Sequence, residues 1–259
     1  MPPAALWGAS QRPIRKRIRI QHRSAPFHPW LNPQAGSRYI RWVNWNRGTA
    51  RVALLVVGCA SLVLISGLDH GLYQFLAQRA PSWKIVPDLR IPSLLVTCVL
   101  CILFGRESLQ APQPSAPWRL IAISCASWLT GCIIAVFLLR VWIPALDSWV
   151  DKVSFEVTGL LAEEFLFRGA VFTLAIYAFP RVNGNMMIGV VISASLFGIQ
   201  HFGYHGWHFG AAAITQVIYT SALGVLLGLL RGWSGSLWVP AALHIANNLV
   251  TLSYRLLGN

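Results

Sequence analysis

Charged residues are scarce in this chain, and acidic residues are the scarcest of them. Only 8 of the 259 residues are Asp or Glu, and all charged residues together make up 11% of the sequence. A soluble globular domain averages about 25% charged residues, so this composition argues against a soluble protein. The hydrophobic fraction of 55% indicates an integral membrane protein instead.

No acidic residue precedes Asp69, whereas ten of the 21 Lys and Arg residues lie in residues 1–51. A basic segment beside the first apolar stretch is the positive-inside signal, with a secondary attraction to anionic lipid. Nucleic acid is not expected as a partner despite the net charge of +13, because no aromatic and basic binding module is present. No apolar run follows the basic cluster before Val52, so a secretory signal is not expected. An acid-free, Arg-rich N-terminus also resembles an organelle transit peptide.

Three catalytic or metal-binding signatures are missing as well. The chain has no H-E-x-x-H sequence, so a conventional zinc protease of that type is not expected. No Ser–His or Cys–His pattern points to a nucleophilic side chain. Cys98 and Cys101 form a C-x-x-C, but the second pair of a zinc ribbon is lacking. All five cysteines lie in apolar runs, where they are interpreted as small apolar residues within helices.

Seven apolar stretches follow the basic segment. They span residues 52–68, 91–105, 120–139, 154–179, 186–203, 209–230 and 236–257. A helix needs about 20 residues to cross roughly 30 Å of hydrocarbon, so the short second stretch is either a tilted or re-entrant piece or a span extended by its flanks. We therefore predict an all-α, polytopic transmembrane helix bundle with about seven spans. The charge bias places the N-terminus in the cytoplasm, and we expect a multi-pass protein of a bacterial inner membrane.

The fourth stretch carries the first of three polar motifs, an E-E-x-x-x-R formed by Glu163, Glu164 and Arg168. A charge in hydrocarbon costs roughly 2.5–3.5 kcal/mol on insertion scales, so such residues face a protein interior or a hydrated cavity and favour a functional interpretation. Residues four apart share a helix face, which predicts an ion pair between Glu164 and Arg168. Glu163 is then left to act as a general base. The alternative is a structural pair with one additional Glu.

Two further motifs lie on other stretches. Phe197 and His201 form an F-x-x-x-H at the end of the fifth stretch, where His201 could orient a water, shuttle a proton, bind zinc or simply lie at the membrane interface. His244 and Asn248 form an H-x-x-x-N near the middle of the last stretch. Both can donate hydrogen bonds, as an oxyanion hole requires, although polar contact between helices is the alternative.

Together the three motifs predict more than any one of them. Polar clusters on three separate spans can meet at one buried point. A water held by His201 and deprotonated by Glu163 would then attack a carbonyl group, and the carbonyl oxygen would be received by His244 and Asn248.

In their order and placement these motifs resemble those of the CAAX-protease and bacteriocin-processing family (CPBP, also called ABI) of intramembrane endopeptidases. The resemblance covers roughly residues 150–255. Phe167-Arg168-Gly169 and the run 235–240 are further context for it. It implies an all-helical membrane protein that hydrolyses peptide bonds within the bilayer.

The resemblance also implies a role for each matching residue. The first Glu, here Glu163, activates the water, and the second, Glu164, is functionally important too. His201 helps to position the water, whereas His244 and Asn248 look like the oxyanion donors. We expect a metal-free glutamate mechanism, without a cofactor. A zinc site built from Glu163, His201 and His244 remains open by ligand type.

The sequence therefore predicts three parts: a basic N-terminal cytoplasmic tail (1–51), N-terminal transmembrane helices (52–150) and a catalytic core (151–259). The expected partners are the lipid bilayer and a membrane-associated protein or peptide substrate, lipidated or carrying a sorting signal. Two alternatives are a non-catalytic immunity or scaffold protein of the same fold and a proton-coupled transporter. The complete motif set favours the enzyme, and no inverted repeat supports the transporter.

Overall fold

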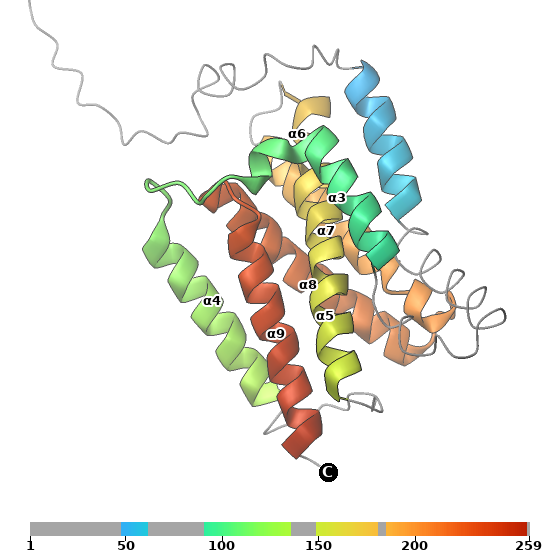
Figure 1. Cartoon of the computed structure of the whole chain (residues 1–259), viewed down its shortest axis with the longest axis vertical. Helices are drawn as coiled ribbons and strands as arrows, with labels where there is room; N and C mark the ends of the chain where they lie inside the picture. Colours follow the sequence, from blue (N-terminus) through green and yellow to red (C-terminus); the bar gives the residue numbers. More distant parts are fainter. Residues whose placement is uncertain (1–47, 62–90, 136–148, 181–184, 258–259) are drawn as a thin grey trace, which may run out of the picture. The chain divides into compact units, whose positions relative to one another are not determined.

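The computed structural model describes residues 48–61, 91–135, 149–180 and 185–257, which belong to the compact unit Trp45–Asn259. Every regular element in these ranges is helical (Figure 1), which confirms the predicted all-α class. The elements are Gly48–Ser61, α3 (Ile91–Gly105), η3 (Arg106–Leu109), α4 (Trp118–Ile133), α5 (Trp149–Glu164), η5 (Phe165–Val171), α6 (Phe172–Ala178), α7 (Asn185–Gln200), η6 (Gly203–His205), α8 (Ala211–Ser234) and α9 (Trp238–Leu257).

Two helices in the described ranges are long and apolar enough to cross a membrane, namely Asn185–His205, which includes α7, and α8. The helices Gly48–Ser61 and α4 are apolar but shorter. The ends of the predicted stretches 52–68 and 120–139 lie partly outside the described residues. The count of about seven spans and the cytoplasmic N-terminus therefore stay predictions.

The first described helix begins at Gly48, a few residues before the end of the predicted tail at residue 51. The reason is that Arg51, assigned to the basic tail, has a partner within the bundle. Its Nε atom donates a hydrogen bond to the carbonyl oxygen of Ala178 at 3.2 Å, and its guanidinium lies 5.5 Å from the ring centre of Phe179. These contacts satisfy a cation at the end of α6 and allow the helix to start before the apolar run.

Helices α7 and α8 pack closely because small residues line their contact. A Cβ atom at Gly198 of α7 would collide with the hydroxyl of Ser221. On α8, a Cβ atom at Gly224 would lie 3.0 Å from the Cα atom of Ala194, and one at Gly228 would lie 3.2 Å from that of Val190. Small residues of this kind let the backbones of two helices approach closely. The pair forms the wall against which the fourth span packs.

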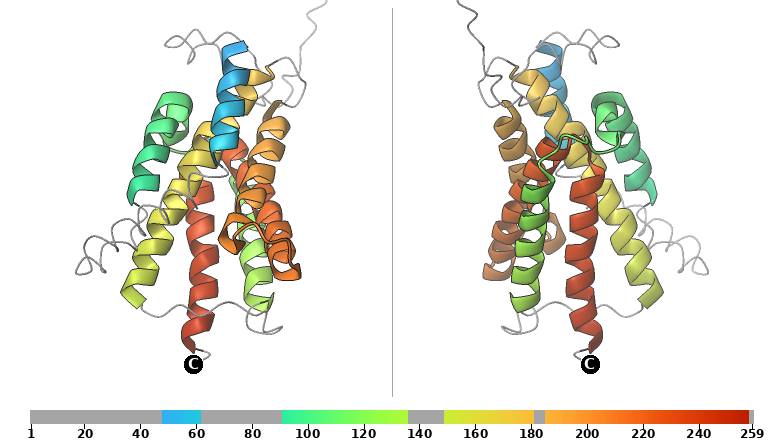
Figure 2. Two further views of the ribbon diagram at one scale, coloured as in Figure 1. Left: turned by 90° about the vertical axis from the view of Figure 1, so that its right-hand side faces the viewer. Right: turned by 90° about the vertical axis from the view of Figure 1, so that its left-hand side faces the viewer.

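Helix α9 lies beside α4 and α5 in all three views (Figures 1 and 2). Its start is fixed by a tight turn, because Gly235 ends α8 in the left-handed conformation, with φ of +71°. The segment before α4 pairs with this turn. The amide of Leu237 donates to the carbonyl of Ser108 at 2.8 Å, and the amide of Gln113 donates to that of Ser234 at 2.9 Å. These bonds set the position from which α9 enters the bundle.

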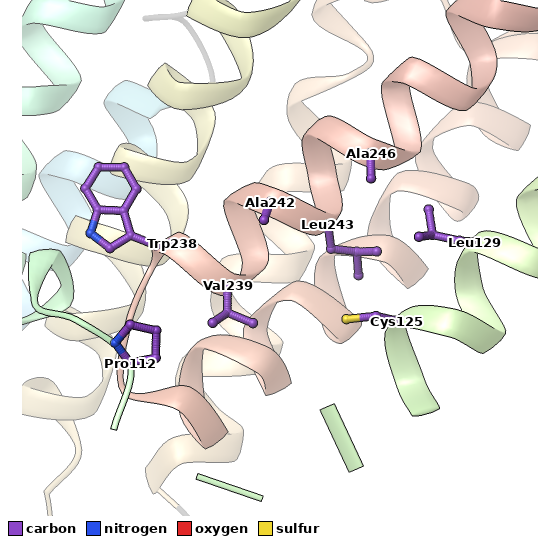
Figure 3. Close-up of a pocket in the computed structure, with 8 residues that line it drawn as sticks. All are labelled: Pro112, Cys125, Leu129, Trp238, Val239, Ala242, Leu243 and Ala246. Carbon is purple, nitrogen blue, oxygen red and sulfur yellow. The ribbon is translucent and has the colours of Figure 1, made fainter. Parts of the chain in front are cut away.

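An open, almost wholly apolar pocket of about 400 Å³ lies beside α4 and α9 (Figure 3). It is lined by Pro112, Cys125, Leu129, Trp238, Val239, Ala242, Leu243 and Ala246.

Candidate active site

The two glutamates lie where the fourth span changes its helical form. The sequence predicted one span over 154–179, and the chain is helical without a break from Trp149 to Ala178. Within this helix α5 ends at Glu164 and is followed by the π-helical segment η5 before α6 begins. All seven residues of η5 are buried, and the Nε atom of Arg231 donates a hydrogen bond to the carbonyl oxygen of Arg168 at 3.3 Å. A π-helical turn needs such compensation, and it occurs frequently at functional sites.

Glu164 and Arg168 form the ion pair that the spacing predicted. The Nη1 atom of Arg168 lies 2.9 Å from Oε1 of Glu164, and both side chains are fully buried. The guanidinium also lies 4.3 Å from the ring centre of Phe197, a cation–π contact, and its Nη2 atom donates to the carbonyl oxygen of Gly224 at 3.5 Å. Buried charges persist only when such partners compensate for lost hydration.

His244 joins the last span to this pair. Its Nδ1 atom lies 2.8 Å from the same Oε1 atom of Glu164. A carboxylate that is paired with arginine only accepts hydrogen bonds, so Nδ1 carries the proton that it donates. The opposite nitrogen, Nε2, then faces Glu163, whose Oε2 atom is 3.9 Å away. The two glutamates thus contact opposite sides of one imidazole ring.

Tyr204 contacts the other oxygen of Glu163. The phenol donates a hydrogen bond to Oε1 of Glu163 at 2.9 Å, and its ring lies edge-on to that of His201, with centroids 5.2 Å apart. His201 donates through Nδ1 to the carbonyl of Phe197 at 2.8 Å, because a carbonyl only accepts. The sequence analysis did not single out Tyr204. Its place three residues after His201 was the available signal.

Phe197 is the residue around which the three motifs gather. It is fully buried, and its ring meets the rings of His201 and His244 edge-on, with centroids 4.9 and 5.5 Å apart. The guanidinium of Arg168 lies over the same ring. Residues from the fourth, fifth and last predicted spans therefore meet at one buried point, as the sequence predicted.

Asn248 lies one turn beyond His244 on α9, at the spacing that places two residues on one helix face. Its Oδ1 atom accepts a hydrogen bond of 3.1 Å from the amide of Asn247. Asn247 itself contacts two neighbouring helices, α4 and α8, through Trp128 and Tyr219.

The polar residues of the site include ligand types that zinc uses, namely carboxylate and imidazole. In the described part of the chain, no three side chains of His, Cys, Asp or Glu are grouped so that they could hold a metal. Both Nδ1 atoms of the candidate histidines are engaged with protein acceptors, a pattern that ligating and non-ligating histidines share. The expectation of a metal-free mechanism and the zinc alternative with Glu163, His201 and His244 therefore both stay predictions.

The part of the chain that carries the three motifs matches a protein family. Residues 145–250 match the family described as type II CAAX prenyl endopeptidase Rce1-like. This confirms the resemblance to the CAAX proteases. All six candidate residues lie inside the matched region, whereas α3 and α4 lie outside it. Comparison with curated proteins gives no match, and neither does comparison with solved structures.

Proposed function

We propose that this protein is an intramembrane endopeptidase that hydrolyses peptide bonds of membrane-associated substrates with a water activated by Glu163. The observation that carries the proposal is the separation of 3.9 Å between Oε2 of Glu163 and Nε2 of His244, both almost fully buried. That separation is too long for a direct hydrogen bond. It is short enough for one water, or for a substrate carbonyl, to contact both groups.

The hydrolysis proceeds in two steps. Glu163 takes a proton from the water as the water oxygen bonds to the peptide carbonyl carbon, and the carbonyl π electrons move to its oxygen. His244, when doubly protonated, donates to this oxyanion through Nε2, and Asn248 donates through its amide. The tetrahedral intermediate then collapses and the C–N bond breaks. The proton held by Glu163 passes to the leaving amine, so the products are a carboxylic acid and a free amine, and Glu163 is again a carboxylate.

The remaining residues hold the reacting groups in place. The Glu164–Arg168 pair fixes the imidazole of His244 through Nδ1, as a carboxylate commonly orients a catalytic histidine. Tyr204 fixes the carboxylate of Glu163, and the ring of Tyr204 also contacts His201, which we assign to holding the water. Such orientation matters because a misplacement of about 1 Å can cost roughly 100-fold in rate.

The substrate class that we propose is a membrane-associated protein or peptide that is lipidated or carries a sorting signal. The matched family is described as a type II CAAX prenyl endopeptidase. Residues 1–144 lie outside the match, so that description does not extend to the first part of the chain. We therefore propose a substrate class wider than prenylated CAAX proteins, which also includes membrane-associated substrates that carry a sorting signal.

The test compares membrane peptides from cells that produce the wild-type protein or Glu163→Gln, a change that keeps the side-chain shape but removes the base. We expect precursor proteins to accumulate, and their cleaved fragments to vanish, in the variant. Glu107→Gln is the matched control, because Glu107 also accepts a hydrogen bond from a tyrosine, Tyr177, at 3.0 Å but belongs to none of the motifs. Identical peptide profiles for wild type and Glu163→Gln would disprove the proposal.

A further inference from the structure

A second polar cluster lies on α9 next to the candidate site, centred on Asn247. The Oδ1 atom of Asn247 accepts hydrogen bonds from the indole Nε1 of Trp128 at 2.9 Å, from the hydroxyl of Tyr219 at 2.7 Å and from the thiol of Cys132 at 3.1 Å. The asparagine is 2% exposed. Its partners come from α4 and α8, so three helices meet at one amide oxygen.

The donors determine which way the amide of Asn247 faces. An indole nitrogen can only donate, so the Asn247 atom beside Trp128 must be the oxygen. That oxygen accepts from Trp128, Tyr219 and Cys132. The NH₂ group therefore faces the other way, where it lies 3.1 Å from Oδ1 of Asn248.

The orientation of the Asn247 amide determines the orientation of the Asn248 amide. Because an NH₂ group only donates, the Asn248 atom that it contacts must be the oxygen. The side of the Asn248 amide turned away from Asn247 is then its own NH₂ group. If that amide rotated by half a turn, it would present an oxygen to a developing oxyanion, and the interaction would change from attraction to repulsion.

We propose that Trp128, Tyr219 and Asn247 are positioning residues that keep the amide of Asn248 turned as a hydrogen-bond donor. This inference rests on the proposed function, in which Asn248 receives the carbonyl oxygen. Trp128 is partly buried, and Tyr219 is 39% exposed. The cluster also joins α4 to α9 beside the apolar pocket described above (Figure 3).

Trp128 comes from α4, a helix outside the part of the chain that matches the family. Helix α4 lies outside residues 145–250, which match the endopeptidase family. The orientation of a residue inside the matched region thus depends on a helix that the family match does not include. The rings of Trp128 and Tyr219 are also in contact, with centroids 5.8 Å apart, so the two donors support each other.

The test measures kcat and KM on a synthetic peptide that spans a cleavage site found in the membrane-peptide comparison. Loss of one oxyanion donor lowers kcat about 100- to 1,000-fold, so Asn248→Ala should fall by that factor. Asn247→Asp keeps the shape but loses the NH₂ donor, and its kcat should fall by roughly the same factor with little change in KM. Trp128→Phe and Tyr219→Phe each remove one donor and keep a ring, so kcat should fall about tenfold.

The decisive comparison is made in the Asn248→Ala background. If Asn247 acts through Asn248, adding Asn247→Asp there should change kcat by less than about twofold. A further large drop would show that Asn247 has a separate, merely structural role, and the inference would be wrong. Trp238→Phe is the matched control, because its indole donates to the carbonyl of Leu109 at 2.9 Å and touches neither asparagine.

The same experiment separates the two proposals. If Asn248→Ala lowers kcat but Trp128→Phe, Tyr219→Phe and Asn247→Asp all leave it unchanged, the positioning network is wrong and the protease assignment stands. If Asn248→Ala itself has no effect while Glu163→Gln is inactive, Asn248 is not an oxyanion donor, and the network has no catalytic purpose. A melting temperature in detergent accompanies each variant, so that loss of folding is recognised as such.

Discussion

Glu164 accepts hydrogen bonds from both Arg168 and His244 on a single oxygen atom, Oε1. The contact with His244 crosses from the fourth predicted span to the last. It assigns different tasks to two adjacent glutamates, since Glu164 is held by two donors from the protein while Glu163 is held by the phenol of Tyr204. In the proposed reaction, Glu164 orients His244 and Glu163 activates the water.

Replacing Arg168 should destabilise the protein as well as inactivate it. Arg168→Ala leaves Glu164 as a buried charge without its cation, which typically costs about 3–5 kcal/mol. Thermal unfolding in detergent, followed by circular dichroism, measures the effect. Arg119→Ala is the control, because that residue is exposed at the start of α4. An Arg168→Ala protein that melts at the wild-type temperature would count against the pair as a structural element.

Tyr204→Phe should reduce activity without unfolding the protein. The variant keeps the ring beside His201 but loses the hydrogen bond to Glu163, and bonds to charged groups contribute about 1.5–3 kcal/mol. We expect kcat/KM to fall about tenfold or more and the melting temperature to change little. Tyr177→Phe loses an equivalent bond to Glu107. Equal losses of activity in the two variants would show that Tyr204 has no special relation to the base.

Two glycines where α3 meets η5 should tolerate no side chain. A Cβ atom at Gly105 would collide with the carbonyl of Gly169, and one at Gly169 would collide with the sulfur of Cys101. Gly105→Ala and Gly169→Ala should therefore lower the melting temperature, because overpacking costs about 1–3 kcal/mol.

Gly131→Ala is the control, because we expect it to leave the melting temperature unchanged or to raise it. Nothing lies within 4 Å of a Cβ atom at Gly131 in α4, and alanine favours a helix over glycine by about 1 kcal/mol. This variant should melt at or above the wild-type temperature. If all three alanine variants had the same melting temperature, the close approach of α3 and η5 at Gly105 and Gly169 would not require glycine.

Activity should survive removal of metal ions. The proposed reaction uses a carboxylate, two imidazoles and an amide, so dialysis against a strong chelator should leave kcat within about twofold of the untreated value. Elemental analysis of the same sample shows whether zinc was removed. Loss of activity that returns on adding zinc would establish the metal-dependent alternative with Glu163, His201 and His244 as its first candidates.

Much of the fold was predictable because the length of each apolar stretch can be read directly from the sequence. The predicted stretches 186–203, 209–230 and 236–257 agree with α7, α8 and α9 to within a few residues. The pairing of Glu164 with Arg168 was predictable for the same kind of reason, since helical spacing alone brings them together. Local periodicity was sufficient in both cases.

The rest depends on tertiary contacts that no spacing encodes. Tyr204 reaches Glu163 only because the chain turns after α7, and Trp128 reaches Asn247 only because α4 lies beside α9. The hydrophobic pattern also does not predict that η5 is π-helical. It inserts one residue into a turn without changing the apolar character of the stretch.

That extra residue has a consequence for what the fourth span can face. Each residue turns an α-helix by about 100°, so α6 leaves η5 rotated by that angle relative to an uninterrupted continuation of α5. Accordingly α5 contacts α3 and α9, whereas α6 contacts α7 and again α3. A single stretch of chain can thus offer its carboxylates to one set of neighbours and its packing surface to another. If η5 were one residue shorter, the carboxylates at the end of α5 and the packing surface of α6 could not both face their present neighbours.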